Sequence, residues 1–405
     1  MAGLSLCLLL VVGLLAWAVT DDDPYVAPAP ASPSAAQSVQ PALATETLAS
    51  FQQAVVDDDE DAARALAPEG DTDTADRLAG IVRNAGLLQV DDFALRYVDA
   101  GDSLSRPDGS WSAAVDATWE FHGFDRAPAR AEILVRLEND GDRVALTGFG
   151  GGDRVSPLWL SGPLQVRRTA STLVLVDGTA AAADGYARHA TAAVPVVRRV
   201  LPRWRRGLVV EVPSSVDALD QTLDADPGTY DQIAAVTTAA DGSLAPDAPV
   251  HVFVNADVFG SLRPTGAQVV MSHEATHVAT DAWVSQLPLW LLEGFADYVA
   301  LRDVDLPLAT SASQIIAEVH RDGPPRALPG AAEFNTRTKD LGATYESAWL
   351  ACRLLAQDGG EDALVSFYRS VDRGTDLGAA LRTSFGLSVA GFTQQWRTLL
   401  SDLAE

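Results

Sequence analysis

The chain has 405 residues, with 55 Asp and Glu against 29 Lys and Arg, so its formal net charge is -26. With 47% apolar and 21% charged residues the composition is that of a globular protein, which excludes wholesale disorder and a polytopic membrane protein. The acidic excess also argues against nucleic acid as a partner, because phosphate binding needs a basic surface. The length predicts two to three domains.

The cysteine count restricts the kinds of metal site that this chain can build. There are only two cysteines, and Cys7 lies in the N-terminal apolar run, which leaves Cys352 as the single thiol of the body. This excludes an intrachain disulfide framework and a cysteine-based zinc site. A zinc site must therefore come from the six histidines and the carboxylates.

The N-terminal segment has the features of an export signal. Residues 4–19 are almost wholly apolar, and no charge precedes Asp21. This length lies between a signal-peptide core and a membrane span, and Ala16-Trp17-Ala18 fits a small-x-small cleavage site. We expect residues 1–20 to be a signal peptide or membrane anchor, and residues 21–43 to be a Pro/Ala-rich linker. The body is then exported, either secreted or held outside the cell membrane by the uncleaved segment.

Residues 44–150 are predicted to form a first domain of α+β class. Leu48, Phe51 and Val55 recur at helical spacing, and a further short helix is expected to close at residues 84–86. Apolar residues then recur at every second position, the pattern of a β-strand. They do so in residues 93–97, 111–121, 133–137 and 144–147. Helices followed by a meander predict a sheet with one covered face. This order resembles the NTF2-like fold.

A second domain is predicted after a boundary at residues 148–163, which contain three consecutive glycines. Strands are expected at residues 173–176, 208–212, 233–237 and 250–254, with a helix over 180–201 and mostly helices thereafter. We therefore expect residues 164–405 to form another α+β domain. An arginine cluster within residues 198–206 is interpreted as an exposed helix end, with contact to an anionic lipid or polymer as the alternative.

The sequence His273-Glu274-Ala275-Thr276-His277 carries the strongest chemical signal. Two residues four apart on a helix lie on one face, one turn from each other, so both imidazoles can reach one zinc ion. Glu274 lies beside them, where a carboxylate can take a proton from metal-activated water.

The next predicted helix, which starts near Pro288, supplies a third ligand. Its Glu293 lies among apolar residues, where a bare carboxylate is costly unless it is paired or metal-bound. Asp297 follows one turn later and can accept the outward N–H of a ligating histidine. A catalytic zinc site needs three protein ligands and an open position, which this set provides.

These residues resemble the gluzincin metallopeptidases with peptidase MA-like domains. The resemblance rests on His273-Glu274-x-x-His277 followed by Trp290-Leu291-x-Glu293-Gly294-x-Ala296-Asp297-Tyr298, and similar bacterial proteins often carry an exported N-terminal region. It implies a zincin-like fold, an antiparallel-edged sheet with the HExxH helix and C-terminal helices. It also implies Zn²⁺ bound by His273, His277 and Glu293, Glu274 as general base, and Asp297 as partner of His273.

The fifteen residues between His277 and Glu293 are fewer than in the thermolysin-like and aminopeptidase branches, so no branch is assigned. In such peptidases an edge strand holds the extended substrate, and residues 251–255 are the expected strand. His251 itself is expected on the sheet surface rather than among the ligands.

Tyr345 is the first choice as donor to the developing oxyanion, and His320 and Tyr298 are alternatives. Tyr345 and Trp349 can equally be a core pair.

The function expected from this pattern is hydrolysis of a peptide or protein substrate by zinc-activated water, with Glu274 moving the proton. The competing hypothesis is a cell-surface binding protein whose zinc-binding domain is a scaffold or pseudopeptidase. A third keeps the zinc chemistry but cleaves an amide of a cell-wall peptide.

Overall fold

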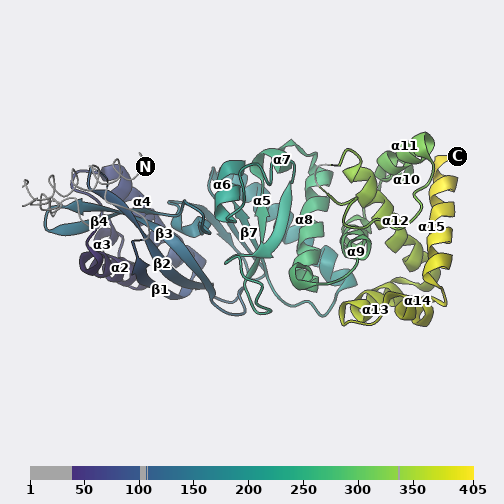
Figure 1. Ribbon diagram of the computed structural model, residues 1–405, viewed down its shortest axis with the longest axis horizontal. Coiled ribbons are helices and arrows are strands. Elements are labelled where there is room, and N and C mark those ends of the chain that lie inside the picture. The colour runs from purple at the N-terminus through teal and green to yellow at the C-terminus, as the bar shows by residue number, and fades with distance from the viewer. Residues whose placement is uncertain (1–38, 101–105, 107, 336–337) are drawn as a thin grey trace, which may run out of the picture.

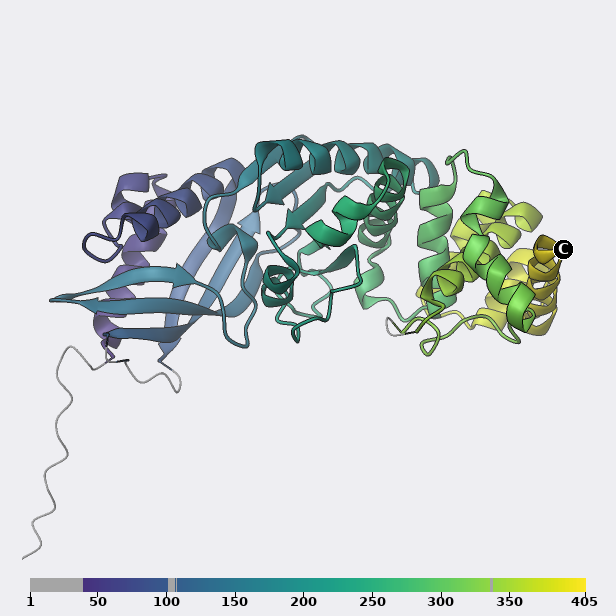
Figure 2. The same cartoon turned by 90° about the horizontal axis from the view of Figure 1, so that it is seen from above.

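The computed structural model describes residues 39–100, 106, 108–335 and 338–405, which form two sheets and many helices. The mixed content confirms the α+β class. The first sheet with its helices lies at one end of an elongated molecule, the second sheet lies in the middle, and the C-terminal helices lie at the other end (Figures 1 and 2). The predicted signal peptide or anchor, residues 1–20, lies outside the described residues. Among the helices that are described, none is long and apolar enough to cross a membrane.

The described part of the first region consists of helices followed by strands, as predicted. Its elements are α2 (Pro41–Val56), α3 (Glu60–Arg64), α4 (Thr72–Leu88), β1 (Val90–Asp99), β2 (Ser110–Phe121), β3 (Ala129–Asp140) and β4 (Arg143–Phe149). The first helix begins at Pro41, inside the range predicted as linker, because proline suits the first turn of a helix. The third helix does not close at residues 84–86 but continues to Leu88, where Gln89 adopts a left-handed conformation.

The four strands pair consecutively and antiparallel in the order β1-β2-β3-β4. On β2, buried Val115, Ala117 and Trp119 alternate with less buried side chains, so one face of the sheet turns to a core. That core lies under α2 and α4 and includes the fully buried Phe51.

The predicted boundary at residues 148–163 is not a plain linker. A short 3-10 helix, η2 (Leu158–Leu160), buries all three of its side chains in the core of the first region. The amide of Asn84 donates to the carbonyls of Trp159 (3.0 Å) and Gly162 (2.6 Å) and accepts from the Leu164 N–H (3.0 Å). The segment is therefore fixed to α4, because buried backbone groups need such partners.

The second sheet has five strands in the order β5-β6-β7-β9-β8. The strands are β5 (Gln165–Arg168), β6 (Thr172–Val176), β7 (Leu208–Val212), β8 (Ala235–Ala239) and β9 (Val250–Val254). The inner three run parallel, and both edge strands are antiparallel to their neighbours. The expectation that residues 251–255 form the edge is wrong, since β9 lies between β7 and β8. The edge strand on this side of the sheet is β8.

Helices cover one face of this sheet and extend beyond it to the C-terminus. They are α5 (Ala180–Val200), α7 (Ala256–Ser261), α8 (Pro264–Thr280), α9 (Leu289–Leu301), α10 (Leu308–Ser311), α11 (Ser313–Asp322), α12 (Leu341–Gly359), α13 (Glu361–Asp372), α14 (Leu377–Phe385) and α15 (Val389–Ala404). Their apolar faces join the sheet in one large core. The short helix α6 (Val216–Thr222) instead packs Leu219 against Phe253 of β9 in a small separate cluster.

The second sheet belongs to both cores. Val174 and Val210 pack with the helices, whereas Leu173, Leu175 and Val209 belong to the core of the first region. Alternate side chains of a strand point to opposite faces, so the first region covers the face that the helices leave open. Strands buried on both faces have continuous apolar sequences, as residues 173–176 of β6 do.

A buried ionic cluster joins the two regions at this face. His251 is not on the sheet surface but is fully buried, and its Nδ1 lies 2.6 Å from Glu211 Oε1 on β7. Its Nε2 lies 2.9 Å from Oδ1 of Asp125, in the turn after β2. Burial opposes the charged imidazolium, but Asp125 and Glu211 outweigh it and raise the pKa of His251 to about 10.

We expect this cluster to make the protein less stable as the pH rises above about 6.5, the ordinary pKa of histidine. Between that pH and about 10 the folded chain keeps a proton on His251 that the unfolded chain has released. The free energy of unfolding should then fall by about 1.4 kcal/mol per pH unit from this group. Denaturant titrations from pH 6 to 10 measure this fall in the free energy of unfolding. The His251→Gln variant should lose this part of the slope, and equal slopes in both proteins would contradict the assignment.

Candidate functional site

The two histidines of the motif lie on α8, which begins at Pro264 and ends where Asp281 turns left-handed (φ 54°). The Asp281 carboxylate pairs with Arg126 of the first region and with Arg206 (3.3 Å). The chain then forms a short 3-10 helix, η3 (Ala282–Val284), before Pro288 caps α9. This tight connection brings the start of α9 alongside the end of α8.

Gly294 on α9 permits the closest helix contact of the site. A Cβ at this position would lie 2.3 Å from the backbone oxygen of Ala348 on α12. Because glycine has no Cβ, α12 can pack directly against α9, and this places Tyr345 of α12 beside the motif histidines. The Gly294 in the predicted motif therefore has a packing reason.

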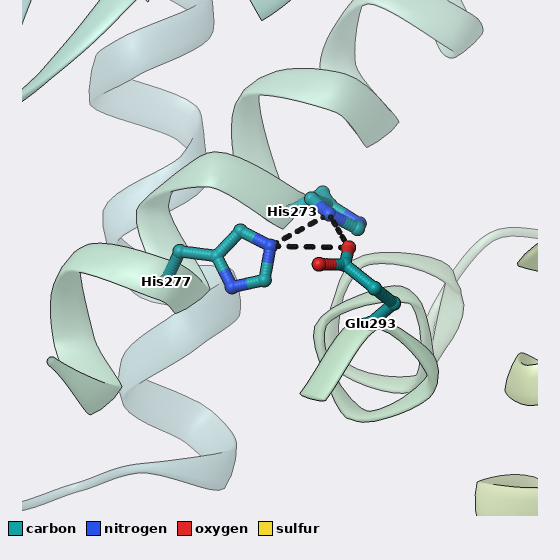
Figure 3. A group of neighbouring side chains, drawn as sticks. All are labelled: His273, His277 and Glu293. Atoms are coloured by element: carbon teal, nitrogen blue, oxygen red, sulfur yellow. Dashed lines mark hydrogen bonds and ion pairs between the residues drawn. The ribbon is translucent and has the colours of Figure 1, made fainter. Parts of the chain in front are cut away.

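Three side chains from α8 and α9 converge on one point (Figure 3). The Nε2 atoms of His273 and His277 are 2.9 Å apart, and Glu293 Oε2 lies 3.2 Å from the first and 3.3 Å from the second. The three side chains are only 11–15% exposed. Together they form a group that could hold a metal ion, with ligand atoms all within 4.8 Å of one another.

The donor set fits zinc. Two imidazoles and a carboxylate are common zinc ligands, and atoms bound tetrahedrally at about 2.0–2.1 Å from one ion lie about 3.3 Å apart. The separations of 2.9–3.3 Å seen between these side chains approach that spacing.

The electrostatics of the site favour a cation. Burial opposes the charged form of His273, but Asp297 and then Glu293 outweigh it and raise its pKa well above the ordinary value. Burial likewise opposes ionisation of Glu293, yet His277 and His273 lower its pKa. Carboxylates that stabilise a buried imidazolium also stabilise a metal ion at the same place.

The two histidines differ in how their second ring nitrogen is held. His273 Nδ1 lies 2.7 Å from Asp297 Oδ1, one turn beyond Glu293 on α9, which fixes that ring. His277 Nδ1 is buried and has no hydrogen-bond partner within the described part of the chain. The orientation of His277 therefore depends on packing and on whatever its Nε2 binds.

The Glu274 carboxylate is hydrogen-bonded to the edge strand rather than to a candidate metal ligand. Its Oε2 accepts a 2.7 Å hydrogen bond from Oγ1 of Thr237, on β8. The sequence interpretation did not select Thr237, because it assigned the sheet edge to the neighbouring strand. Ala235–Ala239 contains two threonines, whereas the sequence neighbours of His251 on β9 are all apolar, and this difference is the signal that could have indicated the edge.

Of the three donors considered, Tyr345 is the one in the site. Its ring lies 6.1 Å from that of His273, and burial, then the nearby carboxylates, raise its pKa. The Tyr298 hydroxyl instead donates to Glu361 (3.0 Å), and burial and that carboxylate raise its pKa to about 12. His320 is exposed on α11, away from the residues that line the cleft.

Two adjoining cavities make a cleft along β8. One, of about 250 Å³, includes His277 in its wall and is called here the His277 lobe; the other, of about 290 Å³, includes Asp297 and is called the Asp297 lobe. His273, Glu274 and Tyr345 line both. The candidate metal ligands and Glu274 are thus open to a molecule that lies across the junction of the lobes.

Comparison with known proteins yields little. No protein-family model and no curated protein matches the chain. Among solved structures, it is similar to the one described as "Crystal structure of M1 zinc metallopeptidase from Deinococcus radiodurans", with 15% identity and a TM-score of 0.33. The match covers 74% of this chain and 61% of that chain. These low values add nothing to the geometry of the site, which alone carries the functional conclusion.

Proposed function

We propose that this chain is a zinc-dependent metallopeptidase of gluzincin type. The observation that carries the proposal is the convergence of His273, His277 and Glu293 within 4.8 Å, with Glu274 beside them in a cleft. In this proposal those three residues hold Zn²⁺, and Asp297 orients His273. The first region is assigned to the NTF2-like fold on its order of helices and strands, and the protein acts outside the cytoplasm.

When bound, zinc would lower the pKa of a water molecule and polarise the substrate carbonyl. Glu274 accepts the proton of the attacking water and passes it to the leaving amine. Thr237 holds Oε2 of Glu274 by its hydroxyl, so the other oxygen remains available for that proton. The Tyr345 hydroxyl, which has no hydrogen bond to any other described residue, donates to the developing oxyanion.

Metal analysis and a hydrolysis assay on the same preparation test the proposal. The full chain should retain about one zinc per chain after dialysis, as a site with three protein ligands does. It should also cleave an unfolded protein such as reduced casein. A protein that binds no zinc, or one that binds zinc and cleaves neither proteins nor peptides, would contradict the proposal.

Replacing Thr237 by Val should slow catalysis without weakening substrate binding. The change removes one hydrogen bond to a carboxylate, worth about 1.5–3 kcal/mol, so kcat should fall by at least about ten-fold. KM and zinc content should stay nearly unchanged, because Val fills almost the same space as Thr in the wall of the His277 lobe and the Thr237 hydroxyl bonds to Glu274 rather than to a candidate metal ligand. Thr237→Ser keeps the hydroxyl and should restore most of kcat. Equal kcat values for the Val and Ser variants would show that the hydrogen bond does not position Glu274.

A further inference from the structure

The cleft offers room on both sides of Glu274, and this bears on where a peptide is cut. Glu274 and Tyr345 line both lobes, so the bond that reacts lies at their junction. A substrate must then place residues on both sides of that bond, one in each lobe. A cleft closed on one side would instead accept only a terminal residue.

Both lobes are walled by apolar side chains. The apolar residues that line only the His277 lobe are Val236, Ala282, Trp283 and Leu292. Those that line only the Asp297 lobe are Ala234, Val269, Val270 and Leu341. Apolar side chains of a substrate gain free energy by leaving water in such surroundings, whereas charged ones lose hydration without a partner.

The charged groups of the cleft belong to the site itself. Among the described residues that line the lobes, the ionisable ones other than Tyr345 are the three candidate metal ligands, Glu274 and Asp297. Asp297 already pairs with His273, and Glu274 with Thr237. No described arginine or lysine lines a lobe to meet a terminal carboxylate, and no further acidic side chain is there to meet a terminal ammonium. A chain end would therefore lie unpaired in the cleft.

The edge strand β8 and the segment that leads into it pass the two lobes in turn, which suits an extended chain. Residues 232–235 line the Asp297 lobe, and residues 233 and 235–237 line the His277 lobe. The outer backbone groups of an edge strand can pair with a peptide of several residues. A peptide paired with β8 in the His277 lobe would continue along residues 232–234 into the Asp297 lobe.

Building on the proposed function, we propose that the enzyme is an endopeptidase that cleaves internal bonds between apolar residues. Its substrate is an extended segment that pairs with β8 and places one apolar side chain in each lobe. Both chain ends stay outside the cleft.

Peptide libraries with free ends and with acetylated and amidated ends, digested by the zinc-loaded full chain and read by mass spectrometry, test this inference. Blocked peptides should be cleaved within about two-fold of the rate of free ones, at internal bonds flanked by Leu, Val, Ile or Phe. Removal of terminal residues alone, loss of cleavage on blocking, or preference for charged flanking residues would overturn the inference while leaving the peptidase proposal intact. No cleavage of any peptide or protein would overturn both.

A charge placed in one lobe gives a second readout. Leu341→Arg, at the start of α12, should raise cleavage beside Asp or Glu by about ten-fold on one side of the cut bond only. Leu306→Arg is the matched control, because Leu306 is exposed and lies outside the cleft. An unchanged cleavage pattern in Leu341→Arg would mean that the Asp297 lobe does not hold a substrate side chain.

Discussion

The Glu274→Gln variant should bind zinc as the parent chain does and lose peptide hydrolysis by about 10²–10⁴-fold in kcat/KM. Gln has nearly the same shape and can still accept the hydroxyl of Thr237 on its amide oxygen, so the site should keep its geometry. It cannot, however, accept the proton of the attacking water. Metal analysis and kcat/KM on an internally quenched peptide measure the two properties.

The matched control is Glu46→Gln, the same change on the exposed face of α2, which should leave activity unchanged. This experiment also separates the proposed enzyme from a binding protein that uses zinc as a scaffold. A Glu274→Gln protein with full activity would exclude the proposed proton transfer. Loss of zinc together with activity would assign Glu274 to the metal site instead.

We expect the second large effect when Glu293, the carboxylate on α9, is removed. Glu293→Ala removes one of the three converging atoms, so the variant should lose both bound zinc and hydrolysis. It should also lose stabilisation by the metal, which for the parent chain is about 2.7 kcal/mol when free zinc is at 100 times Kd. Thermal unfolding with and without added zinc measures this difference.

Asp297→Asn provides the graded comparison for that prediction. Asp297 contacts His273 rather than the convergence point, so its loss should weaken zinc binding by about 10–100-fold without abolishing it. Asp362→Asn, an exposed change on α13, is the neutral control. A Glu293→Ala protein that keeps parental zinc affinity would show that the convergence of the three side chains is not a metal site.

The parts of the site that follow from spacing along one helix could be predicted from the sequence. Four-residue spacing places His273 and His277 one turn apart, and the same spacing places Glu293 and Asp297 on one face of the next helix. The apolar residues around Glu293 signalled a buried carboxylate that needs partners, and the structure brings it against both histidines. These inferences need only local geometry.

The parts that depend on contacts between distant segments could not be predicted in this way. Strand order in a sheet is set by long-range pairing. Nothing within residues 250–254 therefore showed that β8 would pair with β9 and become the outer strand. Thr237 was missed for the same reason. His251 was placed on the surface because the sequence does not show that Asp125, 126 positions earlier, lies 2.9 Å from it.

The shared second sheet has a consequence for how the protein unfolds. If residues 39–163 separated from the rest, Leu173, Leu175 and Val209 would be exposed to water, and His251 would lose one of its carboxylate partners. Exposing that apolar surface and leaving a buried charge pair incomplete are both costly, so neither region has a low-energy state without the other. The two regions should therefore melt together in one cooperative transition. A fragment beginning at Leu164 should be less stable than the same residues within the whole chain.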